Sequence, residues 1–181
     1  MNIISLEDIQ KSKNDFICAI DEFISSIDMS NEEARKRANN FFQWAIKYIN
    51  YIKNENSFKC DKAESLVRGA VVWVEFGFNI GNEFGGKHPA IILWKTDSSL
   101  FVAPLSSREP TEKKDYNVKV EKVYGLKNMV RWTNVLKICN ISIQRVDTTA
   151  SIGNVKGKVL DDITISLIKY IFSHFHLPKA L

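Results

Sequence analysis

The sequence predicts an α+β protein in which a helical hairpin precedes a small antiparallel β-barrel with a C-terminal helix. Three observations support this fold class. Apolar residues recur at helical spacing through residues 6–53, short β-branched and aromatic runs fill residues 70–146, and helical spacing returns after residue 160. Short antiparallel strands with such connections favour a small barrel or a strongly bent sheet.

Two helices are expected at the start of the chain. Ser5 is predicted to cap the first, over residues 6–27, because acidic side chains follow it and meet the positive end of the helix dipole. Ser30 and Glu33 have the spacing of a capping box for the second, over residues 31–53. The short connection between the two helices predicts an antiparallel hairpin.

The polar and aperiodic residues 54–64 predict a connection between two parts of the chain. We therefore expect a hairpin extension over residues 1–60 and a barrel domain over residues 61–181. The apolar faces of the hairpin have two interpretations. They pack on the barrel domain or on a partner subunit, or they form a docking arm for another protein.

The barrel domain is expected to contain short strands and one helix. Gly153 and Gly157 are predicted to lie in turns, and Asp161 or Asp162 is predicted to cap the C-terminal helix. The predicted strands cover residues 71–76, 91–94, 100–105, 117–123, 130–137 and 141–146.

Charge is distributed unevenly along the chain. Residues 1–60 hold 8 Lys+Arg and 9 Asp+Glu, so residues 61–181 hold 17 of the 25 basic and 12 of the 21 acidic side chains. A basic barrel domain suits a polyanion such as RNA, and an ordinary solvated surface is the alternative interpretation.

The composition also bears on location and cofactors. No apolar run reaches the length of a membrane span, and the first residues lack the pattern of an export signal, so we expect a cytoplasmic protein without membrane contact. Cys18, Cys60 and Cys139 are isolated in the sequence, which favours reduced thiols over disulfides or a metal site. We expect no cofactor.

Residues 68–90 join a predicted strand, a glycine-spaced loop and the entrance of a second strand. Pro89 restricts His88 to an extended conformation just before an apolar run. His88 is therefore aimed from the rim of a sheet, beside Lys87 and a few residues after Glu83. Because imidazole changes charge near neutral pH, His88 is a candidate acid or base.

The stretch GAVVWVEFGFNIGNEFGGKHPAIIL at residues 69–93 resembles the MazF/PemK family of toxin endoribonucleases, whose loop reads roughly G-x-E-x-x-G-x-R-P-A. The resemblance continues through FVAPLSS at residues 101–107 and ISIQRV at residues 141–146. It implies an SH3-like barrel of the MazF, PemK and CcdB type, a homodimer and a cognate antitoxin. It also implies metal-independent cleavage of single-stranded RNA to 2′,3′-cyclic phosphate and 5′-hydroxyl ends.

The resemblance also implies roles for individual residues. His88 stands where the family has an arginine, so it keeps a proton-transfer group but loses a permanent bidentate charge. Ser106 aligns with the catalytic hydroxyl of the family, and Lys87 adds a cation to this catalytic set. The expected RNA contacts are Glu83, Ser107, Arg131, Trp132, Asn134, Lys137 and Arg145.

Some of these residues have a second interpretation. Basic groups around Trp132 suit phosphate contact and base stacking, and Trp132 in the barrel core is the alternative. His174 and His176 are interpreted as partners of a helix dipole rather than metal ligands.

Two other functions remain open at this point. Without the family arginine, the barrel is a weak or inactive enzyme that binds RNA or protein. A related barrel family acts on DNA gyrase by protein contact, although the intact loop from Glu83 to Pro89 favours the nuclease.

Overall fold

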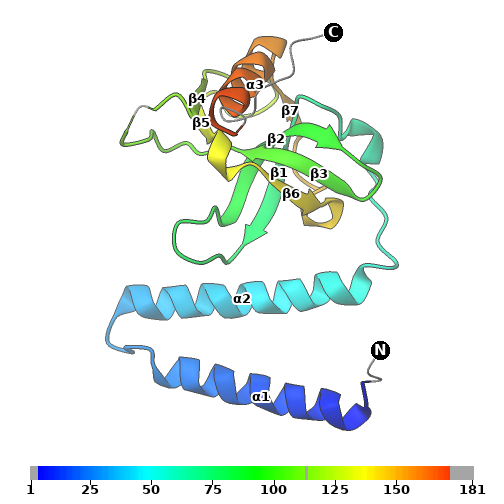
Figure 1. Ribbon diagram of the computed structural model, residues 1–181, viewed down its shortest axis with the longest axis vertical. Helices are drawn as coiled ribbons and strands as arrows, with labels where there is room; N and C mark the ends of the chain where they lie inside the picture. Colours follow the sequence, from blue (N-terminus) through cyan, green and yellow to red (C-terminus); the bar gives the residue numbers. More distant parts are fainter. Residues whose placement is uncertain (1–3, 113, 172–181) are drawn as a thin grey trace. The chain divides into compact units, whose positions relative to one another are not determined.

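The computed structural model describes residues 4–112 and 114–171, and Figure 1 shows the course of the chain. The chain divides into two compact units, residues 1–52 and residues 53–181. The first is helical, and the second combines antiparallel strands with a helix. The predicted α+β class is therefore confirmed.

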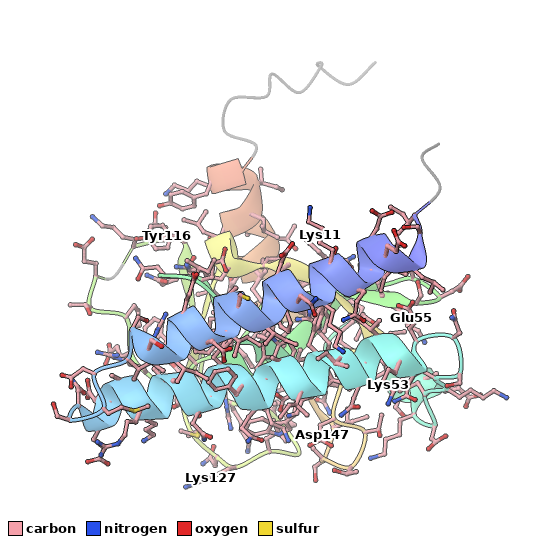
Figure 2. The ribbon with its side chains drawn as sticks, turned by 90° about the horizontal axis from the view of Figure 1, so that it is seen from below. Lys11, Lys53, Glu55, Tyr116, Lys127 and Asp147 are labelled. Atoms are coloured by element: carbon pink, nitrogen blue, oxygen red, sulfur yellow. The ribbon has the colours of Figure 1, made fainter. Side chains whose placement is uncertain are left out.

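The first unit is a hairpin of two antiparallel helices, α1 (Leu6–Ser25) and α2 (Glu32–Asn54), which lie side by side in Figure 1 and Figure 2. The rings of Phe23, Phe41 and Phe42 hold it together, with centroids 5.3 to 5.9 Å apart. Such edge-on aromatic packing combines a large buried area with favourable ring electrostatics.

The helix caps explain where the hairpin begins and turns. Ser5 caps α1 as predicted: its Oγ accepts the Asp8 N–H at 3.1 Å, and the Asp8 carboxylate accepts the Ser5 N–H at 2.9 Å. The capping box predicted at Ser30 is wrong. Asn31 caps α2 instead, because the Ser30 hydroxyl donates to Asp28 at 2.6 Å within the preceding turn.

The second unit contains a five-stranded sheet and a two-stranded sheet, both antiparallel. The larger has the order β6 (Cys139–Ser142), β3 (Ser99–Pro104), β2 (Gly86–Lys95), β1 (Ala70–Gly77) and β7 (Gly153–Asn154). The smaller pairs β4 (Asn117–Val120) with β5 (Arg131–Asn134).

Two isolated bridges join these sheets into a ring. Ser106, just after β3, pairs with Trp132 of β5 through two backbone hydrogen bonds of 2.8 Å. Tyr124, just after β4, pairs with Asn154 of β7 through two bonds of 2.9 Å. The order β1, β2, β3, β5, β4, β7 thereby returns to β1, which is the closed arrangement of a small barrel.

Side chains of the central strands alternate between two apolar clusters, as the pleat requires. Val72 and Val74 of β1 belong to one cluster, which also contains Ile92, whereas Val71 and Ile91 belong to the other. The second cluster is completed by Ile163 of α3 (Gly157–Ile171), whose side chain is fully buried. Every member of both clusters belongs to the second unit, so the barrel has a core of its own.

The described residues include three single turns of 3₁₀ helix, η1 (Ala63–Ser65), η2 (Val135–Lys137) and η3 (Ile143–Arg145), and a side chain caps the last two. The predicted strands 130–137 and 141–146 each end early in such a turn. The reason is local: the Asn134 side chain accepts the Leu136 N–H at 2.9 Å, and the Ser142 hydroxyl accepts the Gln144 N–H at 3.2 Å. These bonds compete with the strand ladder.

Two predictions near the C-terminus are wrong. The helix α3 begins at Gly157 rather than at Asp161 or Asp162, because Val159 and Leu160 already pack on the barrel core. Gly153 lies in β7 and Gly157 is the first residue of α3, so neither lies in the predicted turn, and a Cβ atom on Gly153 would meet Val123 at 2.7 Å. Within residues 4–112 and 114–171, no helix is both long and apolar enough to cross a membrane.

Candidate functional site

The loop between β1 and β2 is folded on itself by its own side chains. Asn79 donates its amide to the Phe84 carbonyl at 2.5 Å, and the Glu83 carboxylate accepts the Ile80 N–H at 3.2 Å. Gly81 has a φ of 58° at the tip, and a Cβ atom on Gly85 would lie 2.9 Å from a backbone oxygen. The loop is therefore preorganised, and the glycine spacing reflects real backbone constraints.

His88 lies inside β2, where it pairs with Val74 across the sheet. Its half-buried ring meets Phe84 edge on, with centroids 4.7 Å apart. Burial lowers the pKa of His88, and a hydrogen bond with the Leu105 backbone opposes this shift only in part. The imidazole is therefore mainly neutral near pH 7, which is the form that accepts a proton.

The register of β2 and β3 places His88 opposite Ser106. Ala90 pairs with Pro104, and the Leu105 N–H donates to the Pro89 carbonyl at 2.8 Å, so the next pair along is His88 with Ser106. Opposed residues of an antiparallel pair have their side chains on the same face, about 5 Å apart at Cβ. Continued past the end of β3, this register therefore sets His88 and Ser106 on one face of the sheet, and their catalytic role stays a prediction.

Ser106 lines a cavity of about 200 Å³, which we call the Ser106 pocket. The Ser106 Oγ accepts the Arg108 N–H at 3.0 Å, which leaves the hydroxyl hydrogen to donate to a ligand. The pocket is lined by Phe84, Pro104, Ser106, Arg108, Pro110, Asn117, Trp132, Asn134 and Lys137. Three of the predicted RNA contacts, Trp132, Asn134 and Lys137, therefore converge here.

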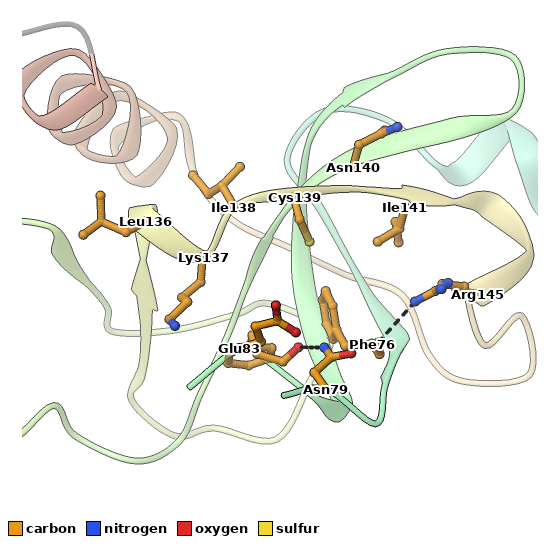
Figure 3. A pocket seen from close by; sticks show the side chains of 11 residues that line it. Phe76, Asn79, Glu83, Leu136, Lys137, Ile138, Cys139, Asn140, Ile141 and Arg145 are labelled. Carbon is orange, nitrogen blue, oxygen red and sulfur yellow. Dashed lines mark hydrogen bonds between the residues drawn. The ribbon is translucent and has the colours of Figure 1, made fainter. Parts of the chain in front are cut away.

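A second cavity, of about 390 Å³, adjoins the first and is called the Glu83 pocket. Figure 3 shows that Lys137 and Cys139 are directed toward the loop that carries Glu83, whereas Arg145 is directed toward Phe76 of β1. Phe84 and Lys137 line both cavities. The Lys137 ammonium also donates a hydrogen bond to the Asn82 carbonyl. This bond holds the loop that lies between the two pockets.

Lys87 is not directed at this site. Neighbouring residues of a strand point to opposite faces, so the Lys87 side chain leaves the face that bears His88. Its ammonium binds the Asp147 carboxylate at 2.6 Å, which raises the pKa of Lys87 and holds the pKa of Asp147 well below its ordinary value. The catalytic role expected for Lys87 stays a prediction, and the structure shows it in an ion pair.

The remaining predicted RNA contacts are dispersed. Arg131 is 96% buried, and its guanidinium donates to the carbonyls of Lys127 and Met129 at 3.2 and 3.3 Å. Arg145 donates to the Phe76 carbonyl at 3.2 Å on the wall of the Glu83 pocket. Ser107 is exposed beside Ser106.

Arg108 is a residue of the Ser106 pocket that the sequence did not reveal. It stands in the charged segment of residues 106–116, whose Pro110 and high charge predict only a surface loop. The available signal was its distance of two residues from Ser106. Such spacing allows its backbone N–H to bind the serine hydroxyl, which fixes the start of the loop.

Metal-binding side chains are not gathered in the described part of the chain: no three His, Cys, Asp or Glu residues there are placed to hold one ion. His174 and His176 lie outside the described residues.

Among the known structures that resemble this chain, three share 14 to 19% sequence identity with it. A MazF from Deinococcus radiodurans is 19% identical, with a TM-score of 0.48 over 58% of this chain and 94% of that one. The toxin MazF-mt6 of Mycobacterium tuberculosis is 14% identical, with a TM-score of 0.43 over 56% and 95%. A MazE-MazF structure from Deinococcus radiodurans is 18% identical, with a TM-score of 0.44 over 57% and 93%.

Comparison with family models gives a match over residues 67–171, which is more than half of the chain. The match begins just before β1 and ends with α3, so it spans the sheets and both pockets. No curated protein matches the chain. The chain belongs to the family of PemK-like, MazF-like toxins of type II toxin-antitoxin systems.

Proposed function

We propose that this protein is a metal-independent endoribonuclease that cleaves single-stranded RNA through attack by the ribose 2′-hydroxyl. Membership of the toxin family supports this function. What supports it most is the register of β2 and β3, which when continued sets His88, whose pKa is lowered, across from Ser106, and Ser106 lines a cavity. A proton acceptor and a hydroxyl donor side by side suit acid–base cleavage of a phosphodiester.

In this proposal neutral His88 takes the proton from the 2′-hydroxyl. The 2′-oxygen then attacks the adjacent phosphorus, and the bond from phosphorus to the 5′-oxygen breaks. The leaving 5′-oxygen takes a proton from water at the exposed side of the pocket, where Ser107 and Arg108 face solvent. The products are a 2′,3′-cyclic phosphate and a 5′-hydroxyl end.

Charge on the transferred phosphate needs donors, because His88 lacks the permanent charge of the family arginine. The Ser106 hydroxyl is one, and its hydrogen is available because Oγ already accepts a backbone N–H. Arg108 and Lys137 line the same pocket and supply positive charge. Arg108 thus compensates for the arginine that His88 replaces.

The RNA strand lies along the Ser106 pocket in this proposal. Trp132 offers an aromatic face for stacking an unpaired base, and Asn134 offers an amide beside it. Both side chains alternate with the buried Arg131 and Thr133 along β5, so they point into the pocket rather than into the core. As for other toxins of such systems, we propose a homodimer whose activity a cognate antitoxin controls.

The test is cleavage of a long single-stranded RNA by the purified protein in the presence of EDTA. Mass spectrometry of the cut ends should find 2′,3′-cyclic phosphate and 5′-hydroxyl groups. Ser106→Ala should slow cleavage far more than Ser107→Ala, because only Ser106 lines the pocket. Cut ends with 5′-phosphate, or a strict need for Mg²⁺, would refute this reaction class. Binding of RNA without cleavage would instead establish a binding module.

A further inference from the structure

The Glu83 pocket has no role in the chemistry described above, yet it is the larger of the two cavities. At about 390 Å³ it falls within the usual range of ligand sites, roughly 300 to 1,000 Å³. It shares Phe84 and Lys137 with the Ser106 pocket, so a strand whose phosphate lies at Ser106 can place a neighbouring base here. The pocket is therefore placed to read the RNA sequence.

Its walls suit a flat heterocycle. Phe76 and Phe84 meet edge to face with centroids 5.1 Å apart, and Leu136, Ile138 and Ile141 complete the apolar lining. Phe84 is only half-buried, so part of its ring remains available for a ligand. Unpaired bases bind proteins by stacking on aromatic side chains while polar groups read their edges.

The charged residues that line the pocket are Glu83, Lys137 and Arg145, and the Arg145 guanidinium binds the Phe76 carbonyl. Glu83 is the only acidic residue among the described residues that line it, and Lys137 is a cation beside it. The Glu83 carboxylate already accepts the Ile80 N–H at 3.2 Å, which fixes its position and leaves further lone pairs for a ligand. Burial raises the pKa of Cys139, so this thiol adds no negative charge at neutral pH.

We propose that the Glu83 pocket binds an unpaired guanine of the RNA, next to the phosphate held at Ser106; this inference rests on the proposed function. Guanine alone among the four bases has two adjacent N–H donors, N1 and N2, with an acceptor, O6, on the same edge. A carboxylate accepts both donors, and the Lys137 ammonium donates to O6. Adenine, cytosine and uracil each present an acceptor where the carboxylate needs a donor.

The first experiment measures cleavage of oligonucleotides that differ at one base near the cut site, with the full-length protein. Guanine should be preferred by about 10-fold or more over each other base, as expected for a bidentate contact. Inosine, which lacks the N2 amino group, should lose most of this preference. 7-Deazaguanine, which keeps the same edge, should retain it. A preference for another base, or equal cleavage of guanine and inosine substrates, overturns the assignment.

A matched pair of variants tests the residue. Glu83→Gln removes one negative charge and keeps an oxygen acceptor for Ile80, so the loop should stay folded, while the guanine preference should fall to below about 3-fold. Glu121→Gln makes the same change on the far β4 side, where Glu121 pairs with Lys119 at 2.7 Å, and should keep the full preference. A guanine preference that survives Glu83→Gln overturns the role of this carboxylate.

A binding measurement separates this inference from the proposed function. Fluorescence anisotropy with 2′-O-methyl RNA, which has no free 2′-hydroxyl and resists cleavage, reports the pocket alone. Oligonucleotides with guanine should bind about 10-fold more tightly than their inosine counterparts. If the protein cuts no RNA but shows this difference, only the nuclease proposal fails. If it cuts RNA and shows no difference in either assay, only the guanine pocket fails.

Discussion

The ring of Phe84 covers one side of the His88 imidazole, with centroids 4.7 Å apart and planes inclined at 61°. This contact removes water from the histidine, and desolvation is the largest cause of its lowered pKa. Desolvation disfavours the charged imidazolium, so the effect has a definite sign. A smaller side chain at position 84 should return the pKa of His88 toward its ordinary value of about 6.5.

Phe84→Ala should therefore shift the acid limb of the pH–rate profile to higher pH, since more His88 is protonated at any pH near the limb. An NMR titration of the histidine resonances would show the same shift directly. Phe101→Ala, which removes an exposed ring elsewhere on the sheet, is the matched control and should leave the pKa unchanged. An unaltered His88 titration in Phe84→Ala would contradict the role of this ring.

Substitution of His88 itself tests its part in proton transfer. His88→Ala should lower the cleavage rate on the order of 100-fold, the usual effect of losing an acid–base group. His88→Arg should retain more activity and flatten the acid limb, because arginine stays charged across the accessible pH range. Parental rates in His88→Ala, with the thermal melt unchanged, would remove His88 from the mechanism.

Lys87→Met should act on stability rather than on catalysis, because the Lys87 ammonium is held by Asp147. A partly exposed ion pair of this kind contributes about 0.5 kcal/mol to the free energy of unfolding. The lowered pKa of Asp147 means that this contribution is present above about pH 4 and is lost as the pH falls below it.

Thermal melts of parent and Lys87→Met protein at several pH values would show the loss at neutral pH and its disappearance in acid. A Lys87→Met protein of parental stability that cuts RNA slowly would assign Lys87 to catalysis instead.

Arg131→Met should destabilise the second unit by about 2 kcal/mol, because the carbonyls of Lys127 and Met129 would lose a charged donor inside the protein. Urea unfolding measures this change. The RNA affinity of the folded variant should remain that of the parent, since the guanidinium is almost wholly buried. Parental stability combined with weakened RNA binding would restore Arg131 as an RNA contact.

The barrel should fold without the hairpin, because both apolar clusters consist of residues from the second unit alone. A protein of residues 53–181 should unfold in one cooperative transition, monitored by circular dichroism and by tryptophan fluorescence. Loss of cooperativity in this protein would show that the hairpin completes the barrel core.

The sequence was most informative where a local rule determines the structure. Ser5 and its acidic neighbours define the start of α1, and the β-branched and aromatic run from residue 71 defines β1. It was misleading where two local rules compete. Asn31 rather than Ser30 caps α2, since Asp28 captures the serine hydroxyl, and Asn134 ends β5 by capping a turn.

The site was predictable only in part for a different reason. The proximity of His88 and Ser106 depends on the register between β2 and β3, which the family resemblance implies and a single sequence does not show. Whether a basic residue faces the pocket depends on which face of the strand its side chain takes and on how deeply that face is buried. Arg131 and Trp132 are adjacent in the chain, yet one lies inside the protein and the other lines the Ser106 pocket.

Ser106 also takes part in closing the barrel, through its bridge with Trp132. Its backbone forms one of the two single-residue bridges that hold β4 and β5 against the larger sheet. A seam of two hydrogen bonds opens far more readily than a long ladder, so local fraying should begin there before the whole barrel melts. The amide protons of Ser106 and Trp132 should then exchange with solvent faster than those of β1 and β2. On heating, the corner that we propose for catalysis should therefore loosen locally before the barrel unfolds as a whole.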